Sequence, residues 1–169
     1  MLAQISKFAP GAVPAVCKHS WTALTIRVGE HSFNESPGWL RGRPVVVTCA
    51  IGNPGAFLDA ARDSGAVIVG EFVRDDHDAY KPATVRQLLD LASSTRAEAV
   101  LMTDKDWSKL SRVEQDKWPC ATAVPTLQLQ FVHGEAEFDA MILDTVRRVQ
   151  AEMDAEDERE LQRFPDPAS

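Results

Sequence analysis

The sequence predicts an α/β fold with three layers, in which helices cover both faces of a mostly parallel sheet. Apolar runs rich in β-branched residues recur at residues 44–51, 66–73, 97–103 and 122–132, as expected for strands that are covered on both faces. Segments with apolar residues at helical spacing separate the first three of these runs, which predicts right-handed βαβ units and a parallel sheet. The chain of 169 residues has the size of a single domain with a substantial core.

The segments between the predicted strands carry ordinary helix signals. Residues 55–65 and 83–94 each align apolar side chains on one helical face, and Gly65 is placed to end the first helix. A short helix is expected at residues 104–113, and a longer helix with one apolar stripe at residues 136–153. The predicted order of strands and helices is Rossmann-like.

The two ends of the chain are less regular. Residues 20–30 alternate apolar and polar side chains, which predicts one strand near a sheet edge or in a small ribbon. Residues 31–44 have the composition of a loop. We therefore expect a short β-containing N-terminal segment at residues 1–42, an α/β domain at residues 43–150, and an acidic tail at residues 151–169 that is helical in its first part.

Composition limits the cellular setting. The net charge of −7 argues against nucleic acid as a partner and against strong attraction to anionic membranes. The three cysteines are far apart and form no C-x-x-C pair, which favours a reducing compartment. No apolar run approaches the ~18 residues of a membrane span, and the first residues lack the layout of a signal peptide. A cytoplasmic protein without a transmembrane segment is expected.

Polar loops follow the first three predicted strands, at the sheet edge where open α/β folds bind ligands. In the first loop Gly52 relieves the turn, Asn53 is a good N-cap and Pro54 suits the first helical position. The N-terminus of that helix can hold an anion. The alternative is that Asn53 only caps the helix.

The second loop crowds Asp75, Asp76 and Asp78 around His77, ahead of a helix that starts at Pro82. A histidine beside carboxylates can act as a general base near neutral pH. The same cluster could ligate a divalent metal, although no second histidine is nearby. It could also be a solvated turn whose aspartates compensate the helix N-terminus. All three interpretations remain open from spacing alone.

The third loop contains Thr103 and Asp106 at the spacing of a capping box. Lys105 falls in the first helical turn, where a cation opposes the helix dipole. Its presence predicts a partner, either a phosphate or an acidic loop, and Asp104 is placed to be that partner. A surface charge cluster is the plainer alternative.

Taken in order, the three loops resemble the C-terminal half of tetraacyldisaccharide 4′-kinase over residues 14–149. They read L-x-G-R-x-V-V-V-x-C-A-I-G-N-P-x-x-F, then F-x-x-D-D-H-D-x-Y, then A-x-x-V-L-M-T-D-K-D-x-x-K-L. Members of that family typically read G-I-G-N-P-x-x-F, D-H-H-x-Y and T-T-E-K-D-x-x-K-L at these places. The resemblance implies ATP- and magnesium-dependent phosphorylation of the 4′ position of the lipid A disaccharide precursor.

The resemblance also implies roles for individual residues. His77, preceded by Asp76, matches the histidine that is thought to pair with an aspartate of the family's other half and help activate the sugar hydroxyl. Further residues match motif positions that shape the interdomain cleft: Asn53, Tyr80, Thr103, Lys105 and Asp106. The chain departs from the family pattern at four places: Ala50, Asp78, Lys81 and Asp104.

The sequence contains no G-x-x-x-x-G-K-[ST] phosphate cradle. Phosphoryl transfer depends on such a cradle and on a metal ion. We therefore expect no cofactor within this chain, and ATP and Mg²⁺ only through a P-loop partner that acts in trans at the inner face of the inner membrane. The first hypothesis is a lipid A disaccharide 4′-kinase module that is inactive without this partner. The second is a non-catalytic interaction or ligand-binding domain that kept the fold after losing the kinase half. A metal-dependent hydrolase is a third.

Overall fold

The computed structural model describes residue 5, residues 7–76 and residues 78–163, with side chains described as far as residue 159. The chain forms two compact units. One unit is His19–Gln128, and the other joins Met1–Lys18 to Leu129–Ser169. Each unit is described by itself below.

Six strands form one sheet in the order β2-β1-β6-β5-β3-β4. The strands are β1 (Val16–Val28), β2 (His31–Glu35), β3 (Pro44–Cys49), β4 (Val67–Val73), β5 (Ala99–Met102) and β6 (Ala121–His133). β3 pairs in parallel with both β4 and β5, and β5 pairs in parallel with β6. β1 pairs with β2 in antiparallel orientation. With three parallel pairings among the other strands, the predicted mostly parallel α/β sheet is confirmed.

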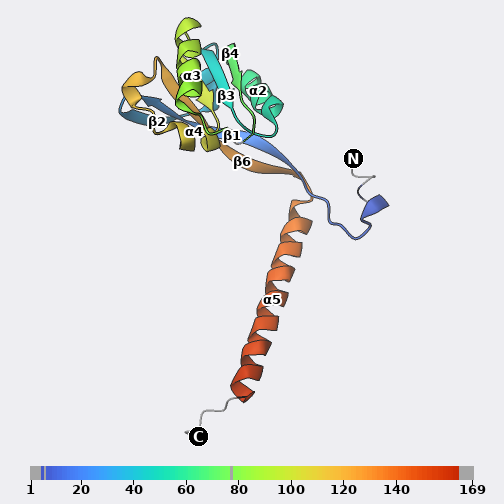
Figure 1. Cartoon of the computed structure of the whole chain (residues 1–169). Coiled ribbons are helices and arrows are strands. Elements are labelled where there is room, and N and C mark those ends of the chain that lie inside the picture. The colour runs from blue at the N-terminus through green and yellow to red at the C-terminus, as the bar shows by residue number, and fades with distance from the viewer. Residues whose placement is uncertain (1–4, 6, 77, 164–169) are drawn as a thin grey trace. The chain divides into compact units, whose positions relative to one another are not determined.

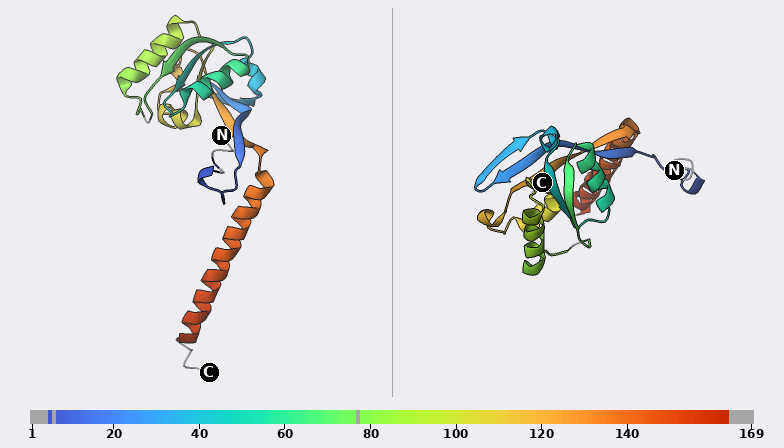
Figure 2. Two further views of the ribbon diagram at one scale, coloured as in Figure 1. Left: turned by 90° about the vertical axis from the view of Figure 1, so that its right-hand side faces the viewer. Right: turned by 90° about the horizontal axis from the view of Figure 1, so that it is seen from above.

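Helices cover both faces of this sheet, as the sequence predicts (Figure 1, Figure 2). The helices of this unit are α2 (Pro54–Asp63), α3 (Pro82–Ser94) and α4 (Asp104–Leu110), with 3₁₀ turns η1 (Pro37–Leu40) and η2 (Gln115–Lys117). Side chains alternate across a strand. In β3, Val45 and Val47 therefore pack in the core cluster that holds Phe57 of α2, whereas Val46 packs in the cluster that holds Leu88 of α3.

The N-terminal part differs from the sequence prediction. Residues 20–28 belong to a longer strand, β1. The chain turns at Gly29 (φ +55°), and β2 then pairs with β1 in a hairpin. The loop predicted for residues 31–44 is therefore wrong at its start. All five residues of β2 are exposed, so this strand has no buried face and no apolar alternation to signal it. The backbone hydrogen bonds to β1, rather than side-chain burial, define β2 as a strand.

The second unit contains α5 (Glu135–Arg163), which extends the predicted C-terminal helix by about three turns. Its predicted apolar stripe exists but is not covered by the described residues, since Ile142, Val146, Val149 and Met153 are between 45% and 60% exposed. Before the helix, Gly134 (φ +76°) lies so close to the backbone of Pro14 that any side chain would collide there. Among the described helices, none has the length and apolar character to cross a membrane.

Candidate functional site

The loops after β3, β4 and β5 meet at the carboxyl edge of the sheet. A methyl group added at Gly52 would lie 3.7 Å from Oδ2 of Asp76, which places the second loop against the first. Lys105, in the first turn of α4, donates from Nζ to Oδ1 of Asp76 at 3.1 Å. Asp76 therefore lies between the first and third loops. We call this arrangement the carboxyl rim: Gly52, Asn53, Asp76, Thr103, Lys105 and Asp106.

Asp106 is the fully buried centre of the carboxyl rim. Both of its carboxylate oxygens accept the backbone N–H of Ala50, each at 3.2 Å, and Thr103 Oγ1 donates to Oδ2 at 2.6 Å. Thr103 also caps α4, because its hydroxyl oxygen accepts the N–H of Asp106 at 3.2 Å, which confirms the predicted cap. The carboxylate, however, does not complete a local capping box. It accepts the buried backbone N–H of Ala50, which directly follows β3, and so joins two loops.

Lys105 has the acidic-loop partner that the sequence allowed, but the partner is not Asp104. The ion pair with Asp76 has both side chains more than 40% exposed. Exposed pairs of this kind contribute little to stability because water screens them. The pair therefore serves mainly to set the orientation of two charges at the rim.

The second loop is shaped by Asp78. One of its carboxylate oxygens accepts the backbone N–H of Tyr80 at 2.7 Å, and the other accepts Nε of Arg74 at 3.2 Å. The Tyr80 N–H bond, and then the Arg74 charge, hold the pKa of Asp78 below its ordinary value against the opposing effect of burial. Lys109 of α4 donates to the Asp78 carbonyl at 2.6 Å. Asp78 is thus engaged in holding the loop.

Tyr80 directs its hydroxyl into the core. The residue is buried in a left-handed conformation (φ 47°), and its phenol oxygen lies 3.2 Å from Thr48 Oγ1. The Thr48 hydroxyl also lies 3.0 Å from the Phe72 carbonyl, so the phenol joins a buried polar chain at the end of β3. Burial raises the pKa of Tyr80, with the Asp106 carboxylate adding to the effect. A role of Tyr80 toward a ligand remains a prediction.

The remaining predicted residues lie at the rim or outside the described structure. Asn53 caps α2 by accepting the N–H of Ala56 at 3.3 Å, so its capping role is confirmed, and it is exposed. His77 lies outside the described residues, and its convergence with Asn53 and Lys105 remains a prediction. Within the described residues, no three His, Cys, Asp or Glu side chains are grouped to hold a metal ion.

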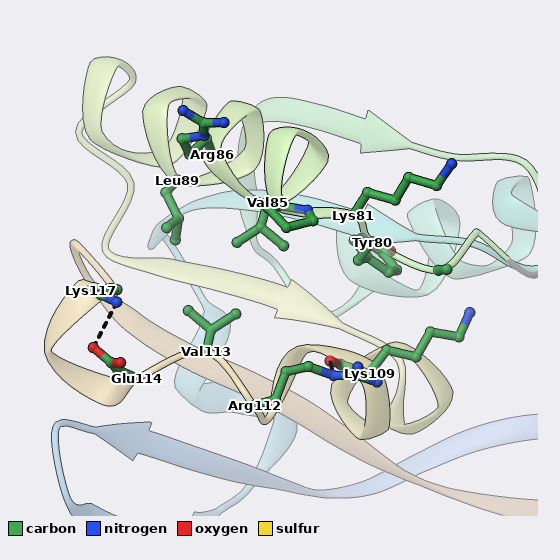
Figure 3. Close-up of a pocket in the computed structure, with 12 residues that line it drawn as sticks. Tyr80, Lys81, Val85, Arg86, Leu89, Lys109, Arg112, Val113, Glu114 and Lys117 are labelled. Carbon is green, nitrogen blue, oxygen red and sulfur yellow. Dashed lines mark hydrogen bonds and ion pairs between the residues drawn. The ribbon is translucent and has the colours of Figure 1, made fainter.

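The structure also contains a groove that the loop motifs did not predict. It has a volume of about 730 Å³ and lies between α3 and the segment from α4 to η2 (Figure 3). We call it the cationic groove, after its basic residues Lys81, Arg86, Lys109, Arg112 and Lys117. The available sequence signal is weak. Lys109 and Arg112 share a helical face at i and i+3, but their approach to Lys81 and Arg86 depends on the tertiary fold.

The fold and the rim define a three-layer α/β domain whose strand-end loops are tied together by charged side chains. Comparison with known proteins identifies the family. The family model described as tetraacyldisaccharide-1-P 4′-kinase matches residues 6–147, so the chain belongs to this family. This confirms the resemblance seen in the loop motifs.

Relatives with the name tetraacyldisaccharide 4′-kinase agree with this assignment. The protein from Shewanella baltica is 32% identical over 123 residues, which are 73% of this chain and 31% of the relative. That from Chlamydia abortus is 26% identical over 65% of this chain and 30% of its own length, and that from Halothermothrix orenii is 32% identical over 47% and 21%. The chain thus spans less than a third of the length of these relatives. No solved structure matches it significantly.

Proposed function

We propose that this chain is the C-terminal module of a lipid A disaccharide 4′-kinase and acts with a P-loop half that another polypeptide supplies. The observation that carries the proposal is the carboxyl rim. All three family motifs contribute to it, and Lys105 joins α4 to the second loop through Asp76 at 3.1 Å. The rim would form one wall of a cleft for the acceptor sugar.

In this proposal His77 acts as the general base that accepts the proton of the 4′-hydroxyl. Asp76 orients the imidazole, and Lys105 holds Asp76 at the rim. ATP and Mg²⁺, bound by the P-loop partner, supply the phosphoryl group. The described residues of this chain offer no carboxylate cluster for the metal, so their part is to position the acceptor and remove its proton.

Asp106 and Thr103 have a positioning role in the same proposal. Their hydrogen bonds fix the end of β3 relative to the first turn of α4. The buried hydrogen bonds of Asp106 therefore set the distance between Asn53 and Lys105 across the rim. Exposed side chains alone would not fix this distance. We expect Asn53 and Lys105 to contact the acceptor sugar rather than the reacting oxygen.

A P-loop partner is also supported by the apolar stripe of α5. Ile142, Val146, Val149 and Met153 recur at helical spacing and remain about half exposed. Exposed apolar stripes of this kind mark interaction surfaces. Through such a partner the chain would work at the inner face of the inner membrane, although the chain itself would remain cytoplasmic.

One observation favours the alternative of a non-catalytic interaction or ligand-binding domain. Asp78 stands where the family has a second histidine, and its carboxylate is engaged by Tyr80 N–H and Arg74. Ala50 similarly replaces a family glycine and packs in the core. In the second loop, a position at which the family motif has histidine therefore has a structural use.

Co-expression with a candidate P-loop half, followed by a phosphoryl-transfer assay on a lipid A precursor, tests the proposal. We expect transfer only when both halves are present, and a loss of roughly 10²–10⁴-fold in His77→Ala. Asp104→Ala is the matched control, because it removes a carboxylate from the first turn of α4 and leaves the rim contacts in place. A complex that forms but transfers no phosphate would favour the non-catalytic alternative.

A further inference from the structure

Most of the cations in the cationic groove have no carboxylate at ion-pair distance among the described residues. Within the described residues, no carboxylate lies at ion-pair distance from any of four groove cations: Lys81, Arg86, Lys109 and Arg112. Among the described residues, Lys109 and Arg112 donate to backbone carbonyl groups, and Lys117 pairs with Glu114 at 2.7 Å. By contrast, Arg43 and Arg62 of the same unit each contact a carboxylate.

The floor of the groove is apolar. Figure 3 shows Val85 and Leu89 of α3 pointing toward Val113 on the opposite side, with Lys81 and Lys109 extending at one end. The ring of Tyr80 closes that end, with Nζ of Lys109 5.7 Å from its centre. A partner that fits this surface carries negative charge at several points and an apolar portion between them.

We propose that the cationic groove docks the chain on an anionic phospholipid bilayer. Headgroup phosphates pair with the four unneutralised cations, and the first methylenes of an acyl chain lie against Val85, Leu89 and Val113. Arginine suits this use because its planar guanidinium binds phosphate with two parallel hydrogen bonds. The long stems of lysine and arginine also pack on apolar surface while their charged ends reach the headgroups.

The exposure of the cations favours a bilayer over a soluble anion. Lys81, Arg86 and Arg112 are exposed, and Lys109 is half buried. A site for one small anion holds its donors converged and partly desolvated. Here the cations border both sides of an open groove, as expected for contact with many headgroups at once.

The proposal goes beyond the proposed function, because it requires neither ATP nor a P-loop partner. Sedimentation of the full chain with vesicles tests it directly. We expect binding to phosphatidylglycerol vesicles, little binding to phosphatidylcholine vesicles, and loss of binding as salt is raised. Each cation at an anionic surface contributes roughly five-fold, so Arg86→Glu with Arg112→Glu should weaken binding by at least about 25-fold.

The matched control is Arg147→Glu with Arg148→Glu, which makes the same charge change on α5. We expect the control to lose far less binding than the groove variant. If the groove variant does not fold, as judged by its thermal unfolding, Arg86→Gln with Arg112→Gln replaces it.

Three results would overturn the proposal. The first is equal binding to the two kinds of vesicle. The second is an equal loss in the control, which would make net charge the cause. The third is displacement of bound chain by inorganic phosphate at constant ionic strength, which would assign the groove to a soluble anion. None of these results bears on phosphoryl transfer with a P-loop half.

Discussion

The carboxyl rim and the cationic groove lie on the same α/β unit but differ in how their charges are satisfied. At the rim, Asp106 is buried and accepts hydrogen bonds from two loops, and Asp76 accepts from Lys105. In the groove, Lys81 and Arg86 are exposed and have no carboxylate within ion-pair distance among the described residues. The rim uses its charges to hold the fold, whereas the groove leaves them for a partner.

This difference separates two kinds of evidence. A buried, fully bonded carboxylate is explained by stability alone, so the rim geometry would persist in a module that no longer supports catalysis. Groove cations that have no carboxylate partner among the described residues are not explained by ion pairing within the fold and are therefore better evidence of binding. From this contrast we predict that variants of the buried rim residues lower the free energy of unfolding and that groove variants do not.

The largest expected effect is at Asp106. In Asp106→Ala the Ala50 N–H and the Thr103 hydroxyl lose their buried acceptor, which should cost roughly 3 kcal/mol in the free energy of unfolding. Urea denaturation followed by circular dichroism measures the loss. Asp104→Ala is the control, because Asp104 is exposed in the same helical turn. Similar losses in the two variants would mean that Asp106 is not the centre of the rim.

A smaller effect is expected at Tyr80. Tyr80→Phe keeps the buried ring and removes the hydroxyl that lies 3.2 Å from Thr48 Oγ1. The variant loses the hydrogen bonding of one buried phenol, and the cost should be about 1 kcal/mol. Thermal unfolding of the two proteins measures the difference. No change at all would contradict the placement of the phenol in the core.

Asp78 should make the stability of the second loop depend on pH. Its folded-state pKa is below the ordinary value of 3.8, so the ionised form stabilises the fold above that value and the contribution is lost as the pH falls through the folded pKa. Asp78→Asn should therefore be less stable than the wild type at neutral pH and equal to it in acid. Urea denaturation across this pH range gives both values. A difference between the two proteins that persists unchanged in acid would contradict this account.

Features that depend on local chemistry could be predicted from the sequence. The β-branched run of β3 identified a strand covered on both faces, and the caps at Asn53 and Thr103 followed from side chains that bond within three residues. The ordered loop motifs also identified the family, because motif order does not require knowledge of the tertiary contacts. β2 escaped prediction because a polar edge strand carries no apolar alternation.

Features that depend on distant partners could not be predicted. Asp106 and Ala50 are 56 positions apart, and Lys105 and Asp76 are 29 apart, so spacing suggested the nearer Asp104 instead. The cationic groove likewise combines residues of α3 with residues after α4. Net charge argued against anionic membranes, but it says nothing about how the charge is distributed over the surface. Roles for His77 and Asn53 in catalysis remain predictions.

The exposed ion pair at the rim should contribute little to stability. Lys105→Ala removes the partner of Asp76, and exposed pairs are worth about 0.5 kcal/mol or less. If the rim also binds the acceptor sugar, the same variant should lose transfer activity with a P-loop half while its unfolding temperature stays nearly unchanged. A large loss of stability would instead make Lys105 a structural residue.

The smallest effect, and the one of opposite sign, is expected in the groove. Arg86→Gln with Arg112→Gln removes two of four unneutralised cations, so at low salt the free energy of unfolding should rise by a few tenths of a kcal/mol as like-charge repulsion is relieved. High salt should abolish the gain, since it screens the same repulsion in the wild type. Thermal unfolding at both salt concentrations measures it. A lower free energy of unfolding in this variant would mean that Arg86 and Arg112 stabilise the fold. The groove would then not differ from the rim in how its charges are used.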